Sequence, residues 1–150
     1  HLLRARAQGR LSVQLISAQW EQPYPEEAAL LGLSAGEAAW VRQVALYCNQ
    51  RLWTLGRTVI PKSAVIHTDG CFTELGSASI GDILFKDSET KRGEITVFQV
   101  HATHPYYALL PASLRHTSTA LWGRHSLLHF QKNTLLVVDV FSPEVFVHAD

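Results

Sequence analysis

The sequence lacks several features that would assign it to a familiar class of protein. It contains no methionine and only two cysteines, and no hydrophobic run approaches the roughly 20 residues of a membrane-spanning helix. It also has no Cys-x-x-Cys or His-Glu-x-x-His motif and no phosphate-binding glycine loop. These absences argue against membrane spans, structural zinc and nucleotide hydrolysis.

Charge and composition further limit the class of protein to which the chain can belong. The 150 residues carry 13 basic and 13 acidic side chains, and this neutral balance argues against an extended nucleic-acid surface. With 47% hydrophobic and 17% charged residues, we expect residues 1–150 to form a single globular domain. The chain begins at His1 and has no methionine, which indicates a trimmed, processed or incomplete chain. A buried free thiol at Cys48 is favoured over a pair with Cys71, and it fits a cytoplasmic protein.

Hydrophobic periodicity predicts strands with short helical interruptions. Alternating segments predict strands at 10–19, 39–47, 52–60, 94–102, 121–131 and 134–141. Short helices are predicted at 28–33, after Pro25, and from a cap at Ser79. Hairpins at both ends of the chain indicate the α+β class, with a single antiparallel sheet and helices packed on one side.

Three charged residues occupy strand positions that should be apolar. Arg42 shares a strand face with Trp40 and Val44, Arg57 shares one with Leu55, and Asp139 interrupts an apolar run. Because a lone buried charge costs several kcal/mol, we expect these residues to build a polar pocket in the core. Two guanidiniums that face one pocket would bind an anionic small molecule. The alternative for Arg42 is an arginine whose head reaches water at a sheet edge.

The remaining ionisable residues leave alternatives open. Arg124 is either a third cation of the pocket or a structural partner of Asp139. Asp139 is either half of a buried salt bridge or a proton-transfer group whose pKa is set by burial and by the arginines. The eight histidines, among them His101 and His104, match no recurrent spacing of metal ligands. The sequence therefore predicts no metal site.

Several motifs resemble the chorismate pyruvate-lyase family, which makes 4-hydroxybenzoate for ubiquinone biosynthesis. They occur in the family's order over nearly the whole chain, at residues 40–42, 55–61, 79–85, 121–126 and 135–143. The resemblance implies a lyase that removes pyruvate from chorismate, with an antiparallel sheet, flanking helices and a buried product site. It implies no metal or other cofactor. We expect a cytoplasmic monomer without a nucleic-acid partner.

The resemblance also implies roles for particular residues. Arg42 would hold the ring carboxylate together with the backbone at Ile80. Arg57 would contact the enolpyruvyl side of the substrate and, with Asp139, is predicted to be catalytic. Asp139 stands where the family has glutamate and would transfer a proton, with Arg124 in support. Family members carry a helical segment upstream of the position of His1, and we expect residues 1–150 to lack it. The alternative function is a non-catalytic effector-binding domain, because the ligand-sensing domains of GntR-type regulators look similar in fold.

Overall fold

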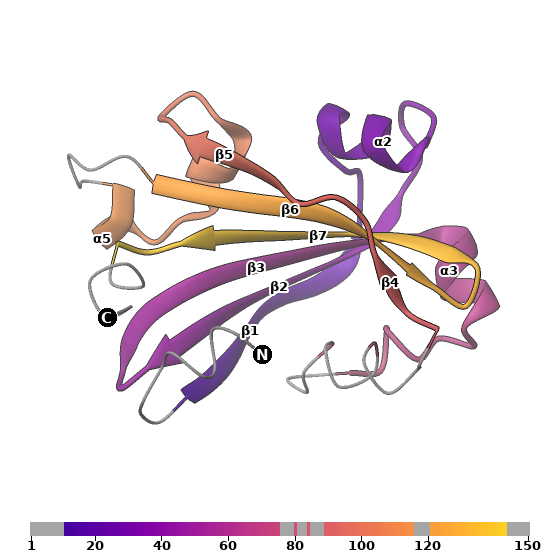
Figure 1. The fold of residues 1–150 in the computed structure, drawn as a ribbon, viewed down its shortest axis with the longest axis horizontal. Helices are drawn as coiled ribbons and strands as arrows, with labels where there is room; N and C mark the ends of the chain where they lie inside the picture. The colour runs from indigo at the N-terminus through magenta and orange to yellow at the C-terminus, as the bar shows by residue number, and fades with distance from the viewer. Residues whose placement is uncertain (1–10, 76–79, 81–83, 85–88, 116–120, 144–150) are drawn as a thin grey trace.

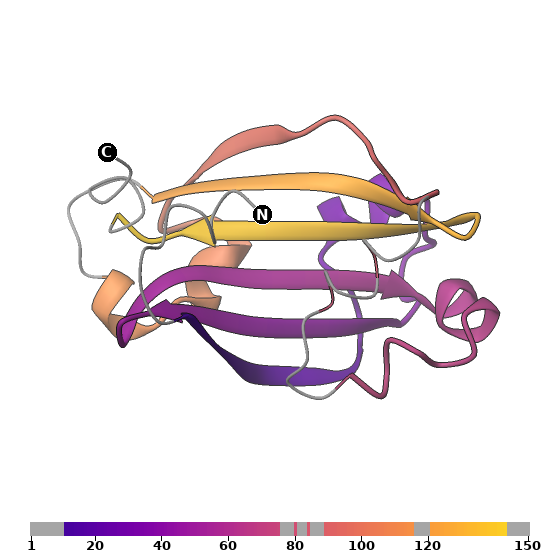
Figure 2. The ribbon, with the colours of Figure 1, turned by 60° about the horizontal axis from the view of Figure 1, so that its bottom comes forward.

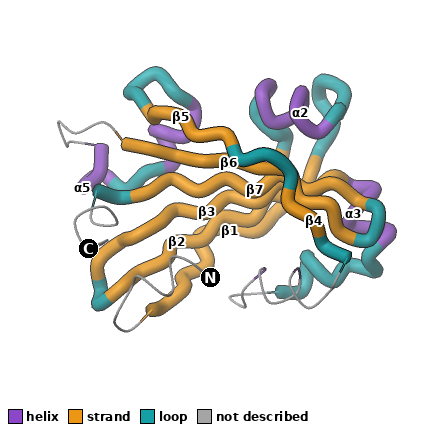
Figure 3. The backbone as a smooth tube through the Cα atoms, in the orientation of Figure 1, coloured by secondary structure: helices purple, strands orange, loops and turns teal. Residues whose placement is uncertain are grey.

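One antiparallel β-sheet dominates the computed structural model, which describes residues 11–75, 80, 84, 89–115 and 121–143 (Figures 1 and 3). The strands are β1 (Leu11–Glu21), β2 (Ala39–Cys48), β3 (Arg51–Pro61), β4 (Lys91–Arg92), β5 (Thr96–Val100), β6 (Leu121–Phe130) and β7 (Asn133–Phe141). They lie in the order β1-β2-β3-β7-β6-β4, and β5 also pairs with β6 (Figure 2). The predicted antiparallel sheet is confirmed.

Two tight hairpins join the long strands of this sheet. Asn49 and Gln50 link β2 to β3 with φ of 51° and 69°, and Gln131 and Lys132 link β6 to β7 with φ of 49° and 66°. Two consecutive positive φ values are typical of type I′ turns, whose twist matches that of the flanking strands. The turn predicted at residues 132–133 is one residue late, because Asn133 already pairs with Phe130.

The helical segments are short and lie on both faces of the sheet. They are α2 (Pro25–Leu31), α3 (Lys62–His67), the 3₁₀ turn η1 (Pro105–Leu109) and α5 (Ala112–Arg115). One core cluster packs the sheet against the regions of α2 and η1, and it includes Val59, Val138, Leu31 and Leu109. A second cluster packs the sheet against α3 and its continuation, and it includes Ile60, Leu135, Val65 and Phe72.

These two clusters correct the expectation that helices pack on one side only. Helix α3, which the sequence did not predict, begins directly after Pro61 ends β3 and buries Ala64 and Val65 (Figure 1). The predicted helix cap at Ser79 lies outside the described residues. The nearby Ile80 and Leu84 are helical, and Leu84 is buried in the second cluster.

Helix α2 has clear start and stop signals. Pro25 occupies its first turn, where its missing N–H and fixed φ cost nothing. The carboxylate of Glu27 accepts a hydrogen bond of 2.9 Å from the backbone N–H of Tyr24, so an otherwise unsatisfied donor is paired. Gly32 ends the helix with φ of 69°, a left-handed conformation that favours glycine.

The described residues also bear on two expectations from composition. Cys48 and Cys71 are both free thiols, and Cys48 is buried, as predicted. Among the described segments, no helix is long and apolar enough to cross a membrane.

Candidate functional site

A bulge in the β2–β3 hairpin sets the positions of the charged residues. Tyr47 lies opposite Leu52. One residue further from the turn, however, Leu46 lies opposite Thr54 and not opposite Trp53. Trp53 is therefore an extra residue in β3. A bulge of this kind moves every later side chain of its strand to the other face, relative to the unbulged pairing.

The bulge separates the two arginines that the sequence placed in one pocket. Arg42 lies opposite Thr58, and Arg57 lies opposite Gln43. Because directly opposite residues share a face and consecutive residues alternate, Arg42 and Arg57 point to opposite faces of the sheet. The prediction that they face one pocket is wrong. Without Trp53, the two-residue turn would have paired Arg42 with Arg57.

Arg42 does share a face with Asp139. Gly56 lies opposite Asp139, and Asp139 lies opposite Arg124. Following these pairs across the sheet defines one surface, which we name the Asp139 face. It comprises Trp40, Arg42, Val44, Thr54, Gly56, Thr58, Trp122, Arg124, Ser126, Val137, Asp139 and Phe141.

Arg42 is deeply buried on this face. Its exposed fraction is 3%, and burial lowers the pKa of its guanidinium. The alternative of an arginine with its head in water is therefore not supported. Strand β2 is two strands away from β7, so the backbones that carry Arg42 and Asp139 are roughly 10 Å apart across the sheet. A long arginine and a short acid can contact the two ends of a ring-sized molecule across such a span.

Asp139 and Arg124 form an ion pair in the middle of the face. Arg124 Nε donates to Asp139 Oδ2 at 3.2 Å, and each side chain is 21% exposed. Burial raises the pKa of the Asp139 carboxyl, while Arg124 and the more distant Arg92 counteract part of this rise. The structure therefore makes Arg124 a partner of Asp139. The guanidinium of Arg124 also lies 5.3 Å from the ring centre of Phe141.

Gly56 lies on β3, between the strands that carry Arg42 and Asp139, and it has no side chain to fill the space there. A Cβ atom at this position would lie 3.7 Å from Asp139 Oδ1 and 3.2 Å from Val44 Cγ2, which is tighter than an ordinary contact. Two buried polar atoms on the same face, Trp40 Nε1 and Thr54 Oγ1, have no hydrogen-bond partner among the described residues. Buried polar groups are normally satisfied. Trp40 lies six positions along β2 from Leu46, which lies opposite Thr54, so the two atoms do not mark a single ligand position.

Ile80 lies on the same side of the sheet. It is partly buried and packs against the second core cluster, whose strand residues include Ile60 and Leu135. The structure thus brings Ile80 to the face of Arg42 and Asp139. Its predicted contact with a carboxylate through the backbone remains a prediction.

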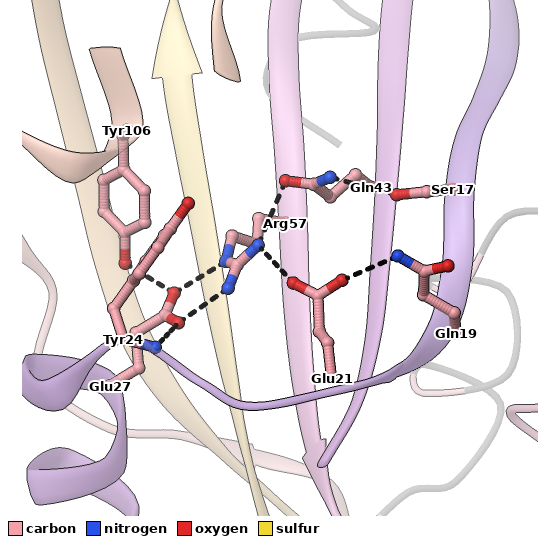
Figure 4. A network of polar contacts seen from close by, with 8 residues as sticks. All are labelled: Ser17, Gln19, Glu21, Tyr24, Glu27, Gln43, Arg57 and Tyr106. Atoms are coloured by element: carbon pink, nitrogen blue, oxygen red, sulfur yellow. Dashed lines mark hydrogen bonds and ion pairs between the residues drawn. The ribbon is translucent and has the colours of Figure 1, made fainter. Parts of the chain in front are cut away.

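Arg57 instead belongs to a buried network on the opposite face (Figure 4). Its Nε and Nη2 atoms donate to the two carboxylate oxygens of Glu27 at 2.7 and 2.8 Å. Its Nη1 atom donates to Gln43 at 3.1 Å and to Glu21 at 3.3 Å. The guanidinium also stacks 4.5 Å above the ring of Tyr24. With its nitrogen donors occupied, Arg57 is a structural residue in this arrangement.

Glu27 completes this network and was missed by the sequence analysis. It is 1% exposed, and besides the Arg57 pair it accepts a hydrogen bond of 2.8 Å from the hydroxyl of Tyr106. Burial and the adjacent carboxylate raise the pKa of Tyr106, which keeps the phenol protonated as a donor. In the sequence, Glu27 is only an acid in the first turn of a short helix. Nothing local distinguishes it from the exposed Glu26.

The histidines do not converge in the described part of the chain. Within that part, no group of three or more His, Cys, Asp or Glu side chains could hold a metal ion. His104 and His125 instead pack against the ring of Phe98, with centroid distances of 5.3 and 5.7 Å. Their rings are part of an aromatic cluster.

Known proteins resemble this chain over almost its full length. The chorismate lyase family model matches residues 2–150. Probable chorismate pyruvate-lyases from Coxiella burnetii and Aromatoleum aromaticum are 33% and 34% identical. The alignments cover 98% and 95% of this chain and 78% and 80% of the relatives, respectively.

Solved structures show the same fold at much lower identity. The C-terminal domain of PhnF superimposes with a TM-score of 0.66 at 13% identity, covering 91% of this chain and 85% of that one. The C-terminal domain of a histidine utilization repressor from Pseudomonas syringae pv. tomato gives 0.67 at 9% identity, covering 90% and 93%. At such identities the likeness concerns the fold alone.

The buried network predicts a large stability loss when Glu27 is neutralised. Glu27→Gln leaves the Arg57 guanidinium buried without its main counter-charge, so the free energy of unfolding should fall by about 3 kcal/mol. Denaturant titration monitored by circular dichroism measures this change. Glu26→Gln, on the exposed side of the same helix, is the matched control. Equal stability of the two variants would contradict a structural role for the pair.

Proposed function

The chain belongs to the chorismate lyase family, and we propose on this basis that it removes pyruvate from chorismate and releases 4-hydroxybenzoate. The observation that best supports this activity is the composition of the Asp139 face. A buried arginine and a partly buried acid share this face, two strands apart, with a glycine between them. Such a surface suits a flat, anionic ring.

Arg42 binds the ring carboxylate in this proposal. A guanidinium presents paired N–H donors that match a carboxylate, and burial excludes the water that would compete for it. The backbone at Ile80 adds a further contact to the same carboxylate, as the family resemblance implies. The ring then lies over Gly56, with the reacting carbons toward Asp139.

Asp139 is the proton-transfer group. In the reaction, the bond between the ring and the ether oxygen breaks, and the ring loses a proton and becomes aromatic. The departing enolpyruvate gains a proton and becomes pyruvate. Burial raises the pKa of the Asp139 carboxyl, so it holds a proton more readily than an exposed acid does, which suits a proton-transfer role. Arg124, which contacts Asp139, stabilises negative charge as it develops on the leaving group.

The alternative of an effector-binding domain is not favoured. The regulator domains share only the fold with this chain, at identities of 9% to 17%. The relatives at 33% and 34% identity are probable lyases. A fold by itself does not determine function, whereas the acid and arginines of the Asp139 face match the chemistry of the lyase reaction.

We further propose that residues 1–150 act as one domain and as a monomer in the cytoplasm, without a nucleic-acid partner. Two free thiols suit a reducing compartment. The formal net charge of zero offers no electrostatic attraction to a phosphate backbone.

Arg42→Ala should abolish detectable binding of 4-hydroxybenzoate while the fold survives. The substitution removes the cation that holds the ring carboxylate, and it leaves the Arg57 network on the other face intact. Isothermal titration calorimetry measures the affinity, and circular dichroism checks the fold. Arg51→Ala, at the exposed β2–β3 turn, is the control. An unchanged affinity in folded Arg42→Ala protein would refute the assignment.

Asp139→Asn should reduce kcat by roughly 10²- to 10⁴-fold, the usual contribution of general acid–base catalysis. Asparagine keeps the size of the side chain but cannot transfer the proton, so 4-hydroxybenzoate should still bind. The pH dependence of kcat that Asp139 causes should also disappear. Near-normal turnover in a stable variant would rule out this role, and a large loss of stability without these effects would indicate a purely structural ion pair.

Activity should survive exhaustive dialysis against a chelator. The elimination is driven by aromatisation, and the residues assigned to it are arginines and an acid. Rates of 4-hydroxybenzoate formation before and after dialysis test this expectation. If activity disappeared and one added divalent metal restored it, the expectation of metal-free catalysis would be wrong.

A further inference from the structure

The proposed reaction leaves one negative charge of the substrate without a partner. Chorismate carries two carboxylates, one on the ring and one on the enolpyruvyl group. Arg42 accounts for the first, and Arg57, which the sequence analysis assigned to the second, lies on the other face of the sheet. A second cationic position on the Asp139 face is therefore required.

Two arginines on β6 and β4 satisfy this requirement. Arg124 lies opposite Asp139, and Arg92 lies opposite Leu128, which is on the same face of β6 as Arg124. Both arginines thus belong to the side of the sheet that carries Arg42 and Asp139. These four side chains have a formal surplus of two positive charges, which a substrate with two carboxylates would neutralise.

The hydrogen bonds of these arginines leave donors available. Only the Nε atom of Arg124 is bonded to Asp139, and among the described residues its two Nη groups have no hydrogen-bond partner. The described part of the chain likewise offers Arg92 no hydrogen bond or ion pair. A guanidinium has five N–H donors, so the two side chains together retain enough donors for a carboxylate.

Arg92 and Arg124 are close enough to influence each other. Desolvation lowers the pKa of Arg92, the charge of Arg124 lowers it further, and Asp139 raises it. Arg92 is exposed and Arg124 is 21% exposed, so water screens part of their mutual repulsion, and Asp139 supplies only one negative charge. A bound carboxylate would relieve the remaining repulsion.

From the register, the ion pair and the unused donors, we propose that Arg124 and Arg92 bind the enolpyruvyl carboxylate of chorismate. This inference rests on the proposed lyase function and adds the residues that distinguish the substrate from its product. The product 4-hydroxybenzoate has a single carboxylate, held by Arg42. After the reaction, the contact with Arg92 and Arg124 is lost along with pyruvate.

The test compares the effect of each substitution on the KM for chorismate with its effect on the Kd for 4-hydroxybenzoate. Arg92→Gln should raise KM for chorismate about tenfold, the lower range for a lost hydrogen bond between charged groups, and leave the Kd for 4-hydroxybenzoate within about twofold. Lys91→Gln is the matched control, because it removes one positive charge from the neighbouring residue, whose side chain points to the other face. For Lys91→Gln, the KM for chorismate and the Kd for 4-hydroxybenzoate should both remain unchanged.

Arg124 requires a charge-preserving comparison because it also contacts Asp139. Arg124→Gln should raise KM and lower kcat, and Arg124→Lys should recover most of the KM while leaving the Kd for 4-hydroxybenzoate unaltered. If Arg92→Gln weakens product binding as much as substrate binding, or changes neither, the subsite is refuted. A wild-type protein that binds 4-hydroxybenzoate but does not convert chorismate would instead refute the lyase function.

Discussion

The extra residue at Trp53 determines which charges in this sheet can meet. An antiparallel hairpin with a two-residue turn fixes its register from the turn outward, and one added residue reverses the face of every later side chain. Arg57 and Gly56 lie beyond the bulge and are both affected. The bulge therefore sends a guanidinium to one face and leaves the glycine facing Arg42 and Asp139 on the other.

The two faces then satisfy their charges in different ways. On the Arg57 face, Glu27 accepts four hydrogen bonds from β3, η1 and the start of α2, so a costly buried ion pair is fully satisfied (Figure 4). This network fixes α2 to the centre of the sheet. On the Asp139 face, by contrast, cations outnumber acids among the described residues, and two buried polar atoms, Trp40 Nε1 and Thr54 Oγ1, have no hydrogen-bond partner there. Unbalanced charge is costly in a core unless a ligand supplies the opposite sign.

The sequence predicted the sheet well because strand formation depends on local periodicity. The strands around Arg42, Arg57 and Asp139 and the burial of both arginines followed from alternation and composition. The relative facing of Arg42 and Arg57 did not, because it depends on a bulge that no local pattern marks. Glu27 was also out of reach, since its partners lie 30 and 79 residues away in the chain. Contacts of this length become apparent only in the folded sheet.

Separating the ion-pair network from the Asp139 face has a consequence for protein engineering. Substitutions that change ligand preference can be confined to side chains of one face, while the residues that hold α2 to the sheet remain untouched on the other. A combinatorial library that varies Val44, Thr58 and Val137 around a fixed Arg42 would sample new ring substituents without removing the Arg57 pair. The positions that would determine ligand preference are thus separate from the ion pair that fixes α2 to the sheet.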